Sequence, residues 1–289
     1  MTRRIALIGF GEVGQILAQD LAGKADLSAW DILFADPASR PAAAARAAGL
    51  VLPASAADAV RGAWLVISAV TAENDLQAAR SAAEGIAPGA FYLDLNSCSP
   101  GQKLASAEAV EAAGGRYVEA AVMSPFPPRR TASPMLLGGP HAAAFLAEAQ
   151  DLGFTGARAY SETVGRAAAT KLCRSVMIKG IEALLTESML AARRYGVEQE
   201  VLASLSDLLP LPDWNATAGY MISRSLEHGV RRAEEMREAA RTVAEAGVEP
   251  LMSLAIAGRQ DWAAGFKAAL SDDLPAMLDA INQQADTAQ

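Results

Sequence analysis

Cysteine and histidine are scarce in this chain of 289 residues. Its two cysteines, Cys98 and Cys173, form no CxxC pair, and its two histidines are His141 and His228. So few potential ligands exclude a disulfide framework and argue against a metal centre, so we predict no metal site. A chain without a disulfide framework is typical of a reducing compartment.

The chain also lacks an excess of basic residues and any apolar run long enough to cross a membrane. Its formal net charge of -8 argues against binding to nucleic acid and to an anionic membrane surface. The start, MTRRIALIGFG, is basic, but its apolar run ends in glycines without a cleavage site, so we expect no signal peptide. These features predict a cytoplasmic protein with a small-molecule substrate and neither a nucleic-acid nor a membrane partner.

Short apolar runs alternate with alanine-rich helical patterns in the first half of the chain. A helical pattern covers 12–24, 73–85 and 100–113. Alternation of strand and helix at this spacing favours βαβ units and a mostly parallel sheet. The predicted strands cover 4–10, 31–36, 64–70, 91–96, 116–122, 134–139 and 157–162.

Strand signals stop after residue 162, and the rest of the sequence has helical patterns only. We therefore predict an α/β fold with two domains: an α/β domain over 1–162 and an all-helical domain over 163–289. Gly247 and Pro250 fit the end of one helix and the start of the next. The predicted helices cover 163–194, 197–209, 213–228, 230–246, 250–258 and 272–285.

A GxGxxG pattern follows the first strand and opens the first helix, which is the context that a dinucleotide-binding loop requires. The first glycine allows the turn, the second the close approach of a pyrophosphate, and the third the packing of helix on strand. The helix N-terminus offers free N–H groups to the phosphates. The α/β domain is thus predicted to be Rossmann-like, with cofactor contacts from Gly9, Phe10, Gly11, Glu12, Val13 and Gly14.

The cofactor is predicted from the end of the second strand. Asp36 ends that predicted strand, and a carboxylate in this position suits the ribose hydroxyls of NAD. Arg40 follows closely and would instead suit the extra phosphate of NADP. We favour NAD and keep NADP as the alternative.

Four segments of the sequence resemble the β-hydroxyacid dehydrogenase superfamily, the group of 3-hydroxyisobutyrate and 6-phosphogluconate dehydrogenases. They are the loop 9–14, LDLNSCSP (93–100), GRAAATKLCRS (165–175) and SLEHGVRRAEEMREAARTVAEAGVEP (225–250). The last is similar to an uncharacterised branch described as 6-phosphogluconate dehydrogenase NAD-binding-like. The resemblance implies a homodimer and hydride exchange between a hydroxy acid and its oxo acid.

Lys171 falls on the lysine of the family's catalytic helix, and the resemblance implies that it is the general acid and base. A lysine can serve in both directions when desolvation lowers its pKa toward neutrality. The alternative is that Lys171 extends to solvent along an amphipathic helix. Lys179, about two turns further on, is predicted to be solvated or dimer-facing, with a substrate anion as the alternative.

The resemblance also implies which further residues contact the cofactor and the substrate, although this sequence differs from the family pattern at two places. Val70, Thr71 and Ala72 would contact the cofactor. The substrate would meet Asn96, Ser97, Ser124 and Ser175. Capping of the helix at Pro100 is the alternative for the first two of these. Ser175 replaces the usual asparagine, and VMSPFPPRR replaces a glycine turn, so the family's substrates are not inherited.

We therefore predict an NAD(P)-dependent dehydrogenase of the β-hydroxyacid type. An imine reductase is one alternative, although a lysine at position 171 argues against it. A sensor or scaffold that binds NAD(H) without turnover is the other, and the changed VMSPFPPRR segment motivates it.

Overall fold

The computed structural model describes residues 3–210 and 213–287, apart from the side chains of residues 149, 150, 207 and 208. The chain divides into two compact units, Met1–Lys171 and Leu172–Gln289. The sequence placed this boundary nine residues earlier, between 162 and 163 (171 − 162 = 9). The difference arises because the first turn of helix α8 (Arg166–Tyr195) packs on the sheet unit, with Ala167 buried against Ala121 and Leu136.

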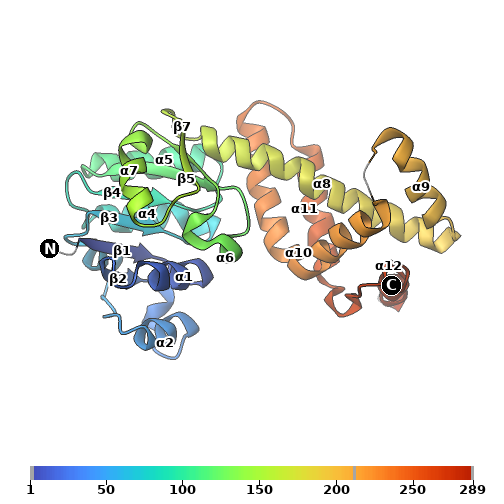
Figure 1. The fold of residues 1–289 in the computed structure, drawn as a ribbon, viewed down its shortest axis with the longest axis horizontal. Helices are drawn as coiled ribbons and strands as arrows, with labels where there is room; N and C mark the ends of the chain where they lie inside the picture. The colour runs from blue at the N-terminus through green and yellow to red at the C-terminus, as the bar shows by residue number, and fades with distance from the viewer. Residues whose placement is uncertain (1–2, 211–212, 288–289) are drawn as a thin grey trace. The chain divides into compact units, whose positions relative to one another are not determined.

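The first unit is built on one seven-stranded sheet with the order β2-β1-β3-β4-β5-β6-β7 (Figure 1). Every neighbouring pair is parallel except β5 and β6, which are antiparallel. This confirms the predicted α/β class and mostly parallel sheet. The strands are β1 (Arg4–Ile8), β2 (Asp26–Trp30), β3 (Leu65–Ser68), β4 (Phe91–Asp94), β5 (Arg116–Val122), β6 (Met135–Gly138) and β7 (Ala157–Ser161).

Helices cover both faces of this sheet, and its central strands are accordingly buried and mostly apolar. Along β1, Ile5 and Leu7 lie in one hydrophobic cluster, whereas Ala6 and Ile8 lie in another. Alternate side chains of a strand point to opposite faces, so both faces are buried. The helices are α1 (Glu12–Leu21), α2 (Arg40–Ala47), α3 (Ala56–Val60), α4 (Asp75–Ala83), α5 (Pro100–Ala112), α6 (Phe126–Arg129) and α7 (Ala142–Asp151), with 3-10 helices η1 (Ile32–Ala35), η2 (Ala72–Asn74) and η3 (Arg130–Ala132).

The second strand was predicted wrongly. Residues 31–36 form a turn and η1, and the strand is the preceding segment DLSAW. Asp31 accounts for the difference, because its carboxylate accepts the N–H of Leu33 at 2.9 Å and caps η1. Ile32 and Leu33 are 65% and 52% exposed, so the apolar run that suggested a buried strand lies at the surface.

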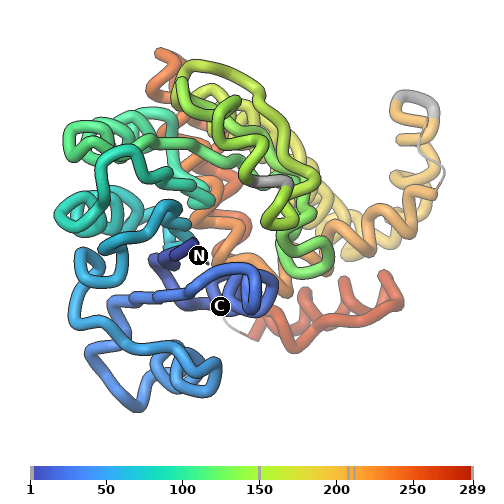
Figure 2. Tube along the Cα trace, turned by 60° about the vertical axis from the view of Figure 1, so that its left-hand side comes forward, coloured from blue at the N-terminus to red at the C-terminus, as the bar shows by residue number. Residues whose placement is uncertain are grey.

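The second unit is helical, as predicted, and Figure 2 traces it from α8 to the red C-terminal helix. It contains the rest of α8 with α9 (Glu198–Leu208), α10 (Trp214–Glu245), α11 (Leu251–Ala264), η4 (Lys267–Ala269) and α12 (Leu274–Thr287). The predicted break between 228 and 230 is absent from α10. A Cβ on Gly229 would lie 2.4 Å from the carbonyl oxygen of Gln260, so this glycine permits close packing on α11. No described helix is long and apolar enough to span a bilayer.

Candidate active site

The glycine loop has the geometry that a dinucleotide requires. Gly9 has a φ of +94°, and a Cβ on it would lie 2.3 Å from the carbonyl oxygen of Ala69. A Cβ on Gly14 would lie 2.2 Å from the carbonyl oxygen of Gly9, so helix and strand need this glycine to pack. Nothing lies within 4 Å of a Cβ on Gly11, and no side chain caps the start of α1. The open space and uncapped N-terminus fit a bound pyrophosphate.

The carboxylate at the end of β2 is Asp31, not Asp36. Its Oδ2 accepts the backbone N–H of Phe10 at 2.7 Å, which places it against the glycine loop. Asp36 lies at the end of η1, where its Oδ1 accepts the N–H of Ala38 at 2.9 Å, and Arg40 is exposed in the first turn of α2. Asp31 stands about 20 residues after Gly11, the spacing of a ribose-binding carboxylate. That spacing could have revealed Asp31, but the misplaced strand hid it.

The other loop residues predicted to contact the cofactor differ in exposure. The Phe10 ring is buried and packs edge-on against Phe34, and the Phe10 carbonyl oxygen accepts an N–H of Gln15 at 3.0 Å, so contact of Phe10 with the cofactor remains a prediction. Glu12 is exposed and Val13 half-buried at the start of α1. Thr71 is exposed, and its Oγ1 accepts Nδ2 of Asn74 at 2.7 Å.

Asn96 joins the loop after β4 to the loop after β3. Its Oδ1 accepts the N–H of Val70 at 2.7 Å, and its Nδ2 donates to Ser68 Oγ at 3.0 Å and to Asp75 Oδ1 at 2.6 Å. The residue is 5% exposed. This placement favours a positioning role for Asn96 over the direct substrate contact predicted from the sequence. Ala72, at the start of η2, is half-buried, and its carbonyl oxygen accepts an N–H from Nε2 of Gln102 at 3.0 Å.

A buried ion pair lies beneath these loops, and the sequence analysis missed it. Nζ of Lys103 lies 2.6 Å from Oδ1 of Asp94, with both side chains essentially inaccessible to solvent. Asp94 also accepts the hydroxyl of Tyr117 at 2.6 Å. A lysine on an alanine-rich helix gives no sequence signal of burial. Its carboxylate partner is nine positions away on another element (103 − 94 = 9).

The electrostatics of this pair include a second carboxylate. Burial, followed by repulsion from Asp75, raises the pKa of the Asp94 carboxyl to about 7 against the opposing attraction of Lys103. Although burial opposes it, attraction to Lys103 and the hydrogen bond from Asn96 hold the pKa of Asp75 below its ordinary value. The two carboxylates outweigh burial at Lys103 and raise the pKa of its ammonium.

The raised pKa predicts a specific pH dependence of stability. Folded Asp94 holds a proton up to about pH 7, whereas the unfolded chain releases it near the ordinary pKa of 3.8. Between these values the folded state binds more protons, so the free energy of unfolding falls as pH rises. Urea unfolding at about pH 5 and about pH 8 should therefore show a larger loss of stability in the native protein than in Asp94→Asn. An equal loss in both proteins would contradict the assignment.

Lys171 and Ser97 are brought together at the carboxyl edge of the sheet. Nζ of Lys171 donates to Oγ of Ser97 at 2.5 Å, and both residues are half-buried. The start of α8 is held by Glu119 on β5, whose carboxylate accepts the N–H of Gly165 at 3.0 Å and that of Ala167 at 2.8 Å. Lys171 is thus about one turn from an anchored helix start.

The hydroxyl groups of Ser124 and Ser175 each have a local partner. Ser124 follows β5, and its hydroxyl donates to the carbonyl oxygen of Pro125 at 3.2 Å. Ser175 belongs to the second unit, is 8% exposed, and accepts Nζ of Lys179 at 3.2 Å. Substrate contact by either serine remains a prediction.

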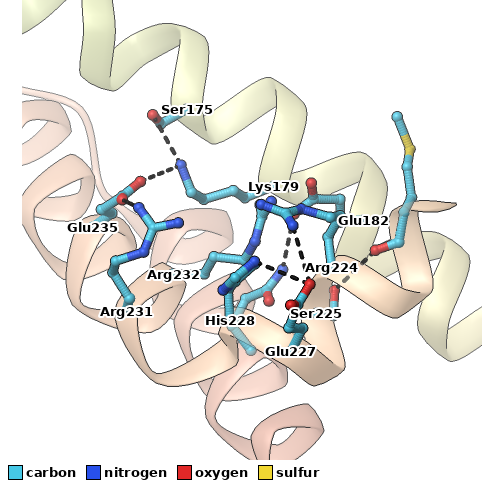
Figure 3. A network of polar contacts seen from close by, with 12 residues as sticks. Ser175, Lys179, Glu182, Arg224, Ser225, Glu227, His228, Arg231, Arg232 and Glu235 are labelled. Carbon is cyan, nitrogen blue, oxygen red and sulfur yellow. Dashed lines mark hydrogen bonds and ion pairs between the residues drawn. The ribbon is translucent and has the colours of Figure 1, made fainter. Parts of the chain in front are cut away.

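Lys179 is not solvated, in contrast to the prediction for it. It is 8% exposed and forms an ion pair with Glu235 at 2.6 Å, within a polar seam between α8 and α10 (Figure 3). Further along the seam, Arg232 pairs with buried Glu182. His228 lies 3.1 Å from Glu227 in the middle of α10. The partners of Lys179 are the residue types that a buried ammonium needs, so its burial is compensated.

Two family models match the chain. Residues 4–150, about half of the chain, match the NAD binding domain of 6-phosphogluconate dehydrogenase. Residues 192–263 match a domain of unknown function, DUF1932. Among curated proteins, none matches the chain in sequence.

Solved structures match nearly the whole length. A conserved hypothetical protein from Sinorhizobium meliloti is 36% identical, with coverage of 98% of this chain and 97% of that one and a TM-score of 0.80. The conserved protein MTH1747, described as structurally similar to 3-hydroxyacid dehydrogenases, is 30% identical, with coverage of 90% and 96% and a TM-score of 0.72. The 3-hydroxyisobutyrate dehydrogenase of Mycobacterium tuberculosis shares the fold at 20% identity, with coverage of 97% and 99% and a TM-score of 0.70.

The match to the nucleotide domain over 4–150 covers the glycine loop and strands β1 to β6 of the sheet. The chain therefore belongs to the β-hydroxyacid dehydrogenase superfamily, the group of 3-hydroxyisobutyrate and 6-phosphogluconate dehydrogenases, in the branch that carries the domain of unknown function.

Proposed function

We propose that the protein is an NAD(P)-dependent dehydrogenase that exchanges a hydride between a hydroxy acid and its oxo acid. The observation that carries this proposal is the contact of Lys171 Nζ with Ser97 Oγ at 2.5 Å. It places an amine at the carboxyl edge of a parallel sheet, where open α/β folds bind their ligands.

The chain's own residues supply binding and proton transfer. Gly11, the uncapped start of α1 and Asp31 would hold the pyrophosphate and ribose of the dinucleotide. When bound, the nicotinamide accepts or delivers the hydride. Lys171, as the free amine, takes the proton of the substrate hydroxyl in oxidation and returns it to the carbonyl oxygen in reduction. Ser97 accepts an N–H of Lys171 and so orients the amine.

NAD is the cofactor that we favour. Asp31 contributes a carboxylate next to the glycine loop, and a carboxylate there accepts hydrogen bonds from ribose hydroxyls but repels a phosphate on the same sugar. Arg40 follows Asp31 closely in the sequence and is exposed. It supports NADP as the alternative, because an arginine near the ribose suits the extra phosphate of NADP. The ratio of catalytic efficiencies with the two cofactors separates these alternatives.

The test is an absorbance screen for turnover of NADH and NADPH. The oxidative panel contains 3-hydroxy acids, sugar acids and aryl hydroxy acids, and the reductive panel contains oxo acids and imines. We expect turnover with at least one hydroxy acid and its oxo acid. Turnover of imines alone would replace the proposal with imine reduction. Binding of NADH without turnover of any compound would favour a sensor.

A further inference from the structure

A single buried polar cluster lies under the two loops that follow β3 and β4. Its members come from five helices and strands besides the loop that carries Asn96, and all are at most 5% exposed. We call it the strand-end cluster. It consists of Ser68, Asp75, Asp94, Asn96, Lys103, Ser106 and Tyr117.

Asn96 is the member that connects the cluster to both loops. Its side-chain Nδ2 donates to Asp75 Oδ1, and its side-chain Oδ1 accepts the N–H of Val70. Its backbone N–H donates to Oδ1 of Asp94 at 2.9 Å. The main chain and the side chain of Asn96 are therefore both fixed by carboxylates. Ser97, the partner of Lys171, is the next residue along the chain.

Lys103 is the cation that these carboxylates share. It pairs directly with Asp94 at 2.6 Å, and its attraction also holds the pKa of Asp75 below the ordinary value. Without this ammonium, two fully buried carboxylates would face each other uncompensated, and such a pair cannot keep both charges. With Lys103 present, Asp94 releases its proton above about pH 7. Without Lys103, one of the two carboxyls would keep a proton above that pH, and an acceptor that holds Asn96 would become a donor.

The ion pair is a poor means of stabilising the fold. Replacing a buried ion pair with apolar side chains of similar volume is often neutral or even stabilising. What the ion pair does provide is orientation, because each carboxylate oxygen of Asp94 and Asp75 has a defined partner. The cluster lies under the loops that carry Val70 and Ser97.

We propose that Lys103 is a positioning residue: by fixing Asp94 and Asp75, it holds Asn96 as a clamp between the loops after β3 and β4 and so sets the position of Ser97. The effect on catalysis rests on the proposed function, because Ser97 orients Lys171. The clamp itself does not depend on that function.

The test compares Lys103→Met with the double variant Lys103→Met/Asp94→Asn and with Ser106→Ala. The double variant keeps the net charge of the cluster and an oxygen that can accept the N–H of Asn96, but it leaves Asp75 without the ammonium that lowers its pKa. Loosening in this variant therefore reports the loss of Lys103 and not a change in net charge. Ser106→Ala is the matched control, because Ser106 donates to Oδ2 of Asp75, the oxygen that does not hold Asn96. Amide hydrogen exchange of segments 69–74 and 95–99 is measured without ligand, followed by NADH affinity and kcat.

Both Lys103 variants should exchange faster at Val70 and in the 95–99 segment, and we expect NADH affinity or kcat to fall about tenfold or more because the loops lose their alignment. Ser106→Ala should lose stability without these changes. If Lys103→Met does not fold, the charge-balanced double variant decides the question. Native exchange and native NADH affinity in the double variant would overturn the proposal.

The outcomes separate the clamp from the proposed function. Faster exchange in the Lys103 variants of a protein that turns over no substrate would support the clamp and count against the dehydrogenase. Unchanged exchange in the Lys103 variants of a protein that oxidises a hydroxy acid would support the dehydrogenase and overturn the clamp. Equally fast exchange of both loops in Ser106→Ala would mean that Lys103 only contributes to stability, and it would also overturn the proposal.

Discussion

Lys171→Met is expected to lower kcat about a hundredfold to ten-thousandfold, the range over which a general acid or base contributes. Methionine keeps the length and apolar stem of the side chain but cannot take or return a proton. NADH affinity should remain close to native, because the glycine loop and Asp31 are untouched. The measurement is steady-state turnover of the best substrate from the screen, together with a fluorescence titration of NADH.

Two further variants show whether the effect belongs to the amine at this position. Lys267→Met removes an exposed lysine from η4 and should leave kcat unchanged. Ser97→Ala keeps the Lys171 amine but removes its partner at 2.5 Å, so we expect a smaller loss of kcat than in Lys171→Met. Near-native kcat in Lys171→Met would mean that another group transfers the proton.

Glu119→Ala is expected to destabilise the fold by about 3 kcal/mol, because two buried N–H groups lose their acceptor. Those groups belong to Gly165 and Ala167 at the start of α8, and Glu119 is 1% exposed. Burial raises the pKa of Glu119, and the N–H bonds from α8 oppose this rise. The free energy of unfolding in urea measures the effect.

The control for this substitution is Glu108→Ala on α5, where the side chain is exposed and the change should stay within about 0.5 kcal/mol. Gly138→Ala is an independent probe of the same contact. A Cβ on Gly138 would lie 2.2 Å from Oε1 of Glu119, so the carboxylate would have to move. A loss in Glu119→Ala no greater than in Glu108→Ala would show that α8 does not depend on this anchor.

The sequence predicts the parts of the fold that depend on local pattern. Apolar runs bounded by turns correctly located β1 and β3 to β6, where most side chains are buried, and a weaker signal located the edge strand β7, which has exposed residues. The same criterion failed at β2, where DLSAW is only partly apolar and the exposed Ile32 and Leu33 follow it. The predicted break at Gly229 is wrong, because this glycine permits a close contact with α11 that no local pattern reveals.

The site was predictable where a motif has fixed spacing and unpredictable where partners are distant in sequence. The glycine loop was recognisable from spacing alone, and Lys171 from its resemblance to a family. Glu119 and Lys103 gave no such signal, because their partners lie on other elements and only the folded chain brings them together. Buried polar positioning residues of this kind are therefore what sequence reasoning misses most readily.

The boundary between the two units lies inside helix α8, and this has a practical consequence for dissecting the chain. A fragment that ends at residue 162, where the strand signals stop, would lack Gly165 and Ala167 and leave the Glu119 carboxylate without its N–H donors. Shortening by these few residues thus removes an anchor from the sheet unit itself. A nucleotide-binding fragment should extend at least through Lys171, and any protease used to separate the units would have to cut a continuous helix rather than a linker.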